Sequence, residues 1–230
     1  MFFEEHAKLL SDFARVSQAA GARADYVQGG GNTSVKLPGG LMAIKASGFC
    51  LSDIRPDKAY AVLDGADLRN FYLTTEPSAL ADVEKEGSAR AKADVRHIDG
   101  LADLRPSVEA GFHSILKTFV VHTHSVYANL AACSTACRPI AAQAFAGANY
   151  TWGWVPYTDP GANLTFAIRD ELRRVEKETG KVPSVILMQN HGIIVHDDDP
   201  DTALAIHTDA NERLARMFLS LIHISEPTRH

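Results

Sequence analysis

The stretch Thr118-Phe-Val-Val-His-Thr-His-Ser125 combines a short apolar run with two histidines. Its β-branched and aromatic residues favour a buried strand. Because side chains on a strand alternate between its two faces, His122 and His124 are expected to point the same way. Two neutral imidazoles at that spacing supply two of the three protein ligands that a catalytic zinc site usually has. Alone the pattern is a weak signal, since surface strands carry such pairs by chance.

A third histidine lies in a tight turn further along the chain. Gln189-Asn-His-Gly192 separates two apolar runs, 182–188 and 193–195, that are predicted to be strands. His191 at the tip of this turn completes a candidate three-histidine zinc site with His122 and His124. A turn histidine with only a hydrogen-bonding role is the alternative, and it is the better reading of His191 taken alone.

A carboxylate precedes the two-histidine strand. The segment Arg105-Pro-Ser-Val-Glu109 is predicted to open a helix that leads into the strand, with Pro106 in the first turn and Ser107 as the cap. A glutamate near a zinc ion that does not need it as a ligand can shuttle a proton, which makes Glu109 a candidate acid/base group. The alternative is a helix-start glutamate that interacts with the helix dipole.

A glycine-rich loop offers donors for an anion. Gly29-Gly-Gly-Asn-Thr-Ser34 carries backbone N–H groups, the Asn32 amide and two hydroxyls, a set that suits phosphate. It lacks the spacing of a P-loop or a dinucleotide fingerprint. Ser47, Gly48 and Ser107 are further donors that could converge on the same anion. A plain glycine-rich entry into a hairpin is the alternative.

The remaining chain alternates helical and strand-like patterns. Helices are predicted over 2–20, 125–132, 161–179 and 201–218, and strands over 26–37, 41–46 and 60–63. A turn is predicted at 64–65. The segment 74–104 is predicted to be a polar surface excursion with helical tendency at 79–86, and 139–160 is predicted to be irregular. This order predicts one mixed α/β domain without a linker.

Composition excludes several classes of protein. The net charge of −5 without a basic block argues against nucleic-acid binding, and no apolar run reaches membrane-spanning length. The N-terminus lacks the basic and apolar segments of a signal peptide. There are three cysteines, Cys50, Cys133 and Cys137. This number is small and odd, so a disulfide framework is not expected and a cytoplasmic location is favoured. Cys133 and Cys137 are predicted to be buried.

Other potential ligands receive no metal role. His113 is interpreted as a helix-packing residue, and His97, His196 and His207 stand in polar or charged contexts. The run 197–199 lacks the alternating ligands of a calcium loop and is expected to charge the N-terminus of the last helix.

The end of the sequence departs from the helical pattern before it. Residues 219–230 are similar to the translation of a common sequencing-library adapter, which predicts a non-native tail from a metagenomic read. A genuine short tail is the alternative.

Taken together, five motifs resemble those of the class II aldolase/adducin family. They are Gly-Gly-Asn-Thr-Ser at 30–34, Lys-Ala-Ser-Gly at 45–48, Arg-Pro-Ser-Val-Glu at 105–109, His-Thr-His at 122–124 and Asn-His-Gly at 190–192. The motifs are specific together and weak apart, and the resemblance covers roughly residues 3–218.

The resemblance implies an α/β/α sandwich around a mostly antiparallel sheet, a single domain over 1–218, commonly assembled as a homotetramer with sites between subunits. It implies that His122, His124 and His191 bind Zn²⁺ or another divalent transition metal. It implies that Glu109 is the acid/base group, and that Asn32, Ser47, Gly48 and Ser107 hold a substrate phosphate.

Two departures concern the substrate side. Sugar-phosphate aldolases of this family have two serines before the glutamate, whereas here Ser107 remains and Val108 replaces the second. This implies a weakened phosphate pocket or a differently substituted substrate. A family segment that closes the site, sometimes with a catalytic tyrosine, would be missing if the tail is foreign, and Tyr127 is a candidate to supply a phenol.

The expected function is a zinc-dependent aldolase-type lyase that cleaves a small phosphorylated ketose or sugar acid through a metal-stabilised enediolate. A sugar-phosphate epimerase or decarboxylase using the same metal site is one alternative. A non-catalytic adducin-like oligomerisation module is another, and the three histidines with Glu109 argue against it. A metal-binding but inactive fragment is a third.

Overall fold

An eight-stranded sheet forms the middle of the structure, a computed structural model that describes residues 1–26 and 30–222. The strand order is β4-β3-β2-β1-β5-β8-β7-β6, and every pair is antiparallel except β6 with β7. The strands are β1 Asn32–Lys36, β2 Leu41–Lys45, β3 Tyr60–Asp64, β4 Val95–Arg96, β5 Phe119–Thr123, β6 Trp152–Val155, β7 Val185–Met188 and β8 Gly192–Asp197.

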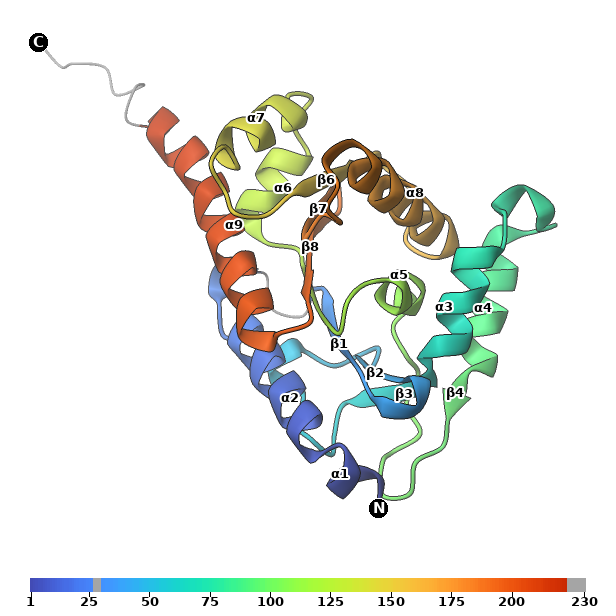
Figure 1. Cartoon of the computed structure of the whole chain (residues 1–230). Coiled ribbons are helices and arrows are strands. Elements are labelled where there is room, and N and C mark those ends of the chain that lie inside the picture. Colours follow the sequence, from blue (N-terminus) through green and yellow to red (C-terminus); the bar gives the residue numbers. More distant parts are fainter. Residues whose placement is uncertain (27–29, 223–230) are drawn as a thin grey trace, which may run out of the picture.

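Helices cover both faces of this sheet. They are α1 Phe2–Glu5, α2 Ala7–Gly21, α3 Gly65–Thr74, α4 Val83–Ala93, α5 Ala110–Ile115, α6 Val126–Ala132, α7 Cys137–Ala144, α8 Ala162–Thr179 and α9 Pro200–Ile222, with short 3₁₀ turns at Ala24–Tyr26, Pro38–Gly40, Leu51–Asp53 and Pro77–Ala79. Helices α2 and α9 pack on one face, and α3, α5 and α8 lie on the other (Figure 1). The predicted α/β/α sandwich around a mostly antiparallel sheet is confirmed.

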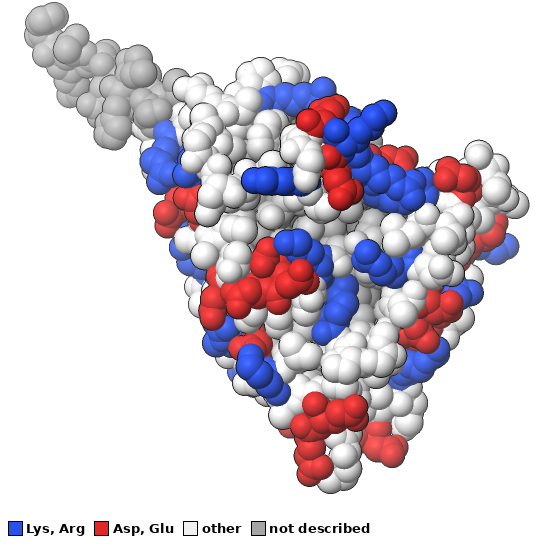
Figure 2. Space-filling view, viewed as in Figure 1, with Lys and Arg blue, Asp and Glu red and all other residues white. Residues whose placement is uncertain are grey.

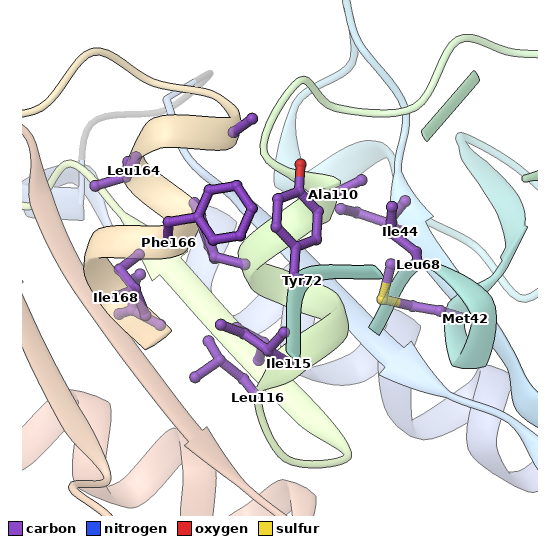
Figure 3. Close-up of a cluster of buried hydrophobic side chains, with 14 of the residues drawn as sticks. Met42, Ile44, Leu68, Tyr72, Ala110, Ile115, Leu116, Leu164, Phe166 and Ile168 are labelled. Carbon is purple, nitrogen blue, oxygen red and sulfur yellow. The ribbon is translucent and has the colours of Figure 1, made fainter. Parts of the chain in front are cut away.

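The two faces of β5 bury different cores. Val120 packs in the cluster between the sheet and α3, α5 and α8, part of which Figure 3 shows. Val121 points the other way and packs with Val16 of α2. Because the alternation continues, His122 lies on the α5 side, where its ring meets Phe112 at a centroid distance of 5.7 Å.

Two predicted starts of elements are wrong. Asp64 and Gly65 do not form a free turn: the Asp64 carboxylate accepts the Asp67 N–H and caps α3. Helix α5 begins one turn later than predicted, with Glu109 at the N-cap and no side-chain cap. Ser107 therefore does not cap the helix, and Pro106 instead pairs with Ala46 beyond the end of β2.

Two further stretches hold more regular structure than their composition indicated. The predicted irregular stretch 139–160 contains most of α7 and the whole of β6. The polar excursion 74–104 holds α4 and the edge strand β4. In contrast, the hairpin of β1 and β2, the helix predicted over 125–132 and the end of α8 at the left-handed Gly180 agree with the pattern of the sequence. Ser125 is the N-cap of that helix, α6.

The C-terminal helix enters the segment that was predicted to be a non-native tail. Helix α9 continues to Ile222, so the first residues of 219–230 extend it, while 223–230 fall outside the described residues. The foreign origin of that segment stays a prediction. Among residues 1–26 and 30–222, the structure contains no helix with the length and apolar character needed to cross a bilayer.

Candidate metal centre and active site

Three histidines meet at the end of β5 where β1 and β8 begin. His122 closes the buried part of β5, His124 follows the strand, and His191 stands in the turn between β7 and β8. Their ring centroids are 4.9 to 5.2 Å apart, and one nitrogen from each lies within 4.8 Å of the others. The predicted convergence of these three imidazoles is therefore present.

The hydrogen bonds of His122 leave the correct nitrogen for a metal. Its Nδ1 lies 3.0 Å from the Ile193 carbonyl oxygen and donates to it, so Nε2 carries the lone pair. His122 Nε2 is 3.2 Å from His124 Nε2. Two nitrogen ligands of one tetrahedral zinc ion are about 3.3 Å apart, given Zn–N bonds of about 2.0–2.1 Å. The donor set therefore fits a divalent ion bound by imidazole nitrogens.

Burial favours the neutral form of His122 and His124. It lowers the pKa of His122 to about 4, against a partial opposing effect of the Glu109 carboxylate. The pKa of His124 is lowered as well, first by burial and then by repulsion from His191. A neutral imidazole is the form that binds a metal, so the cluster is ready for a cation at neutral pH without losing protons.

Glu109 is a buried anion beside this cluster. One carboxylate oxygen lies 3.0 Å from His191 Nε2, and the other lies 3.6 Å from His122 Nε2. Burial alone would raise its pKa, but His122, His191 and the Asn32 amide together lower the pKa well below its usual range. An anionic carboxylate thus lies directly against two of the three histidines.

A chain of hydrogen bonds holds Glu109 from behind. Asn32 Nδ2 donates to Glu109 Oε2 at 2.6 Å and to Ser107 Oγ at 2.9 Å. The Asn32 Oδ1 pairs with His113 Nε2, and His113 Nδ1 lies 2.7 Å from Ser34 Oγ. Sequence reasoning gave His113 only a packing role, although its position four residues after Glu109 placed it on the same helix face.

The remaining candidate phosphate donors gather near Ser107. The backbone N–H of Ser47 donates to the Arg105 carbonyl, and its hydroxyl donates to the Pro106 carbonyl at 3.1 Å. Gly48 follows with φ at 88° and open space around it. The Asn32 amide, in contrast, is directed at Glu109, and Gly29 of the predicted anion loop lies outside the described residues.

Two glycines allow the strands to close around the histidines. A Cβ at Gly31, which has φ at 82°, would lie 2.2 Å from the His122 carbonyl oxygen. A Cβ at Gly192 would lie 2.5 Å from the Thr123 carbonyl oxygen. Both contacts are closer than any side chain permits, so these glycines set the distance between β5 and the segments that carry Asn32 and His191.

Other residues singled out in the sequence lie elsewhere. Tyr127 packs against the apolar cluster between α6, α7 and the sheet. Cys137 is buried as predicted, whereas Cys133 is exposed. His196 and His207, expected in polar surroundings, are buried. His207 donates to or accepts from the Thr123 hydroxyl on the α9 side of β5.

Comparison with solved structures places the fold among class II aldolases. The N-terminal class II aldolase domain of a conserved protein from Thermoplasma acidophilum has a TM-score of 0.73 at 20% identity, with 90% of this chain and 92% of that chain covered. A sugar-phosphate aldolase from Thermotoga maritima has a TM-score of 0.64 at 14% identity, with 97% and 99% covered. YgbL from Klebsiella pneumoniae, provisionally named an aldolase/epimerase/decarboxylase, has a TM-score of 0.63 at 17% identity, with 93% and 90% covered.

At these identities the likeness concerns the fold. A search of curated proteins by sequence finds no match. The family model of the class II aldolase and adducin N-terminal domain matches residues 11–219, and the chain therefore belongs to that family.

Proposed function

We propose that this protein is a zinc-dependent aldolase-type lyase that cleaves a small phosphorylated ketose or sugar acid. The observation that carries the proposal is the charged, buried Glu109 within 3.6 Å of His122 and 3.0 Å of His191. A buried carboxylate is costly unless its charge is used or compensated. Beside three converging imidazoles, it suits proton transfer at a metal centre.

Each group has a distinct task in this proposal. His122, His124 and His191 would hold the divalent ion, which when bound would act as a Lewis acid on the carbonyl and adjacent hydroxyl oxygens of the substrate. Glu109 exchanges the proton: it removes one from the carbon beside the carbonyl in condensation and returns one to that carbon in cleavage. Asn32 keeps the carboxylate aimed at the substrate.

A cavity beside Ser107 supports the assignment of a small anionic substrate. It has a volume of about 830 Å³ and is lined by Ser107, Val108, Arg105, Lys92 and one carboxylate, Glu84, among other residues. The three histidines and Glu109 are not among its lining residues, so it lies next to the metal centre on the Ser107 side. This volume lies within the roughly 300–1,000 Å³ of small-molecule sites. Val108 is 59% exposed. Its methyl groups donate no hydrogen bond, so we propose that the phosphate relies on Ser47, Gly48 and Ser107, with charge from Arg105. Asn32 would contribute by holding the Ser107 hydroxyl through its amide.

Epimerisation or decarboxylation at the same centre is the second candidate. Val108 favours it, because a pocket with one serine fewer holds a phosphate less firmly and suits a differently substituted sugar acid. A non-catalytic module is disfavoured by the buried charge of Glu109, which an interaction surface has no need to maintain.

We propose a cytoplasmic homotetramer as the working form. Three free cysteines, Cys50, Cys133 and Cys137, fit a reducing compartment. Light scattering of the purified protein tests the assembly: a mass of four chains of 24.9 kDa is expected, and a stable monomer would contradict it.

The reaction is tested by incubating the protein with a panel of ketose 1-phosphates and measuring their cleavage. In parallel, 3-keto acids are tested for decarboxylation and the sugar phosphates are analysed for epimers. Glu109→Gln is expected to keep its metal and to lower kcat by about 10²- to 10⁴-fold, because the acid/base group is lost. Glu178→Gln, an exposed change on α8, is the matched control and should leave kcat unchanged. Carbon dioxide or an epimer as the sole product would favour the second candidate, and full activity of Glu109→Gln would refute both.

A further inference from the structure

A second cavity opens at the opposite end of the central strands. It has a volume of about 650 Å³ and lies between the β1–β2 connection, α3, the connection from α5 to β5, α8 and the end of β8. Figure 2 shows a hollow in the middle of this face with blue lysine and arginine side chains around it. The volume again lies within the roughly 300–1,000 Å³ of small-molecule sites.

The register of the sheet separates this cavity from the metal centre. His122 pairs with Asn32 on β1 and with Ile194 on β8. Phe119, three residues earlier on β5, pairs with Asp197 at the cavity end. Strands rise about 3.4 Å per residue, so about 10 Å of sheet lies between the two ends.

More cationic than anionic side chains line the cavity, although the chain carries a net charge of −5. Its five cationic side chains come from four segments that lie apart in the sequence: Lys36, Arg69, Lys117, and Arg169 with Arg173 on α8. Two carboxylates, Glu176 and Asp198, also line it. Lys117 is paired with Asp197 at 2.9 Å and Arg169 with Asp170 at 2.9 Å, so these two charges are compensated.

Lys36 and Arg69 are not compensated in this way. Lys36 Nζ donates to the His113 carbonyl, and Arg69 donates to the Ser114 and Ile115 carbonyls through Nη1 alone. Among the described residues neither cation has a carboxylate within ion-pair distance. These contacts close the C-terminus of α5, but they leave Nε and Nη2 of Arg69 available and supply no counter-charge.

Two polar groups at this cavity, on the half-buried Lys36 and the buried His196, lack partners suited to them. Burial and repulsion from Arg69 lower the pKa of Lys36 well below its usual value. His196, 1% exposed, lines the cavity, and its Nε2 has no well-formed hydrogen bond, although the Pro183 carbonyl lies near the ring. A half-buried cation without a counter-charge and an unsatisfied imidazole nitrogen are both costly, and an oxyanion would relieve both.

We propose that this cavity binds a small organic phosphate, separately from the metal centre. The phosphate oxygens would pair with Lys36 and Arg69, whose planar guanidinium suits two parallel hydrogen bonds to an oxyanion. Leu37, Leu73 and Leu116 line the same cavity and would receive the carbon part of the ligand. The proposal does not depend on the reaction at the metal centre.

Calorimetric titration with phenyl phosphate tests this site, since the probe combines a phosphate with an apolar ring. Arg69→Gln is expected to weaken binding at least tenfold, because it removes the planar donor that no carboxylate compensates. Arg173→Gln, on the exposed side of α8, is expected to weaken phenyl phosphate binding about threefold. It replaces Arg69→Gln as the test variant if Arg69→Gln fails to fold. Arg138→Gln, an exposed arginine on α7 away from the cavity, is the matched control and should change the affinity by less than twofold.

Asn32→Ala distinguishes the two ends of the sheet. It disrupts the proposed substrate side and is expected to leave this binding event in place. The proposal is overturned if the wild-type protein shows no binding of phenyl phosphate at millimolar concentration, or if Arg69→Gln and Arg173→Gln both bind like the wild type. Complete loss of binding in Asn32→Ala would assign the probe to the metal side and would overturn it equally.

Discussion

At the scale of single residues, the arrangement around Glu109 depends on how one amide is oriented. The Asn32 side chain can donate to Glu109 only while its oxygen faces His113, and His113 in turn is tied to Ser34. Burial lowers the pKa of His113 well below its usual value, so the ring is neutral and one nitrogen donates while the other accepts. His113 is therefore a positioning residue for the proposed acid/base group.

Replacement of His113 by phenylalanine tests this role. The ring is kept, but Asn32 loses its anchor, so part of its donation to Glu109 is lost and the pKa of Glu109 rises. We expect kcat to fall about tenfold, equivalent to about 1.4 kcal/mol, and the acidic limb of the kcat–pH profile to move to higher pH. Metal content and KM should stay near the wild-type values.

Two further variants make the His113 experiment specific. His113→Gln retains a hydrogen-bonding group and should recover part of kcat, while His97→Gln changes an exposed histidine and should have no effect. If His113→Phe lowers stability but leaves the pH profile unchanged, the residue acts only in packing.

At the scale of elements, the metal centre depends on the close approach of β5 and β8. Thr123 pairs with Ile193, and the neighbouring Gly192 begins β8 directly after His191. The same strands reach the basic cavity at their other end, and α5 runs beside them from Glu109 to the carbonyls bound by Lys36 and Arg69. A few short elements thus position both sites.

Gly192→Ala is expected to damage the metal centre through this contact. The added Cβ would lie 2.5 Å from the Thr123 carbonyl oxygen and 3.3 Å from His122 Cε1, so the strands must separate. Such overpacking costs about 1–3 kcal/mol. Because His191 is displaced, we expect metal affinity to fall at least tenfold, measured by competition with a chromophoric chelator.

Gly180→Ala supplies the control for the glycine experiment. Gly180 has φ at 73° and nothing within 4 Å of an added Cβ, so alanine there adds only backbone strain of about 1–2 kcal/mol. Its metal affinity should equal that of the wild type. Equal affinity in Gly192→Ala would show that the spacing of β5 and β8 does not control the site.

At the scale of the whole molecule, buried histidines link stability to pH. Burial lowers the pKa of His196 and of His207 from 6.5 to about 3. Between pH 3 and 6.5 these two histidines are protonated in the unfolded chain but not in the folded chain. The free energy of unfolding therefore falls as the pH drops below about 6.5. Each histidine contributes at most about 1.4 kcal/mol per pH unit to this slope.

Denaturant unfolding of chelator-treated protein between pH 7.5 and 4.5 measures that slope. His196→Gln is expected to flatten it, while His97→Gln, whose ring is exposed and whose pKa is raised by Asp103, is expected to leave it nearly unchanged. A slope that is the same in both variants would contradict a role for His196.

The sequence predicted much of this arrangement, for identifiable reasons. The alternation around Val120 and Val121 and the turn at His191 are local patterns, and they fix where three imidazoles meet. Asp64-Gly65 was misread because a helix cap and a turn use the same residues. The basic cavity could not be predicted, because Lys36, Arg69 and Arg173 are isolated cations until the sheet brings their segments together.

The central claim is that His122, His124 and His191 bind one divalent metal ion beside Glu109. Metal analysis of protein purified and dialysed in parallel as wild type, His122→Ala and His97→Ala tests it most directly. We predict about one zinc ion per chain in the wild type and in His97→Ala, and loss of that ion in His122→Ala, because a site with two remaining imidazoles holds zinc far more weakly. Full zinc stoichiometry in a folded His122→Ala variant would contradict the assignment.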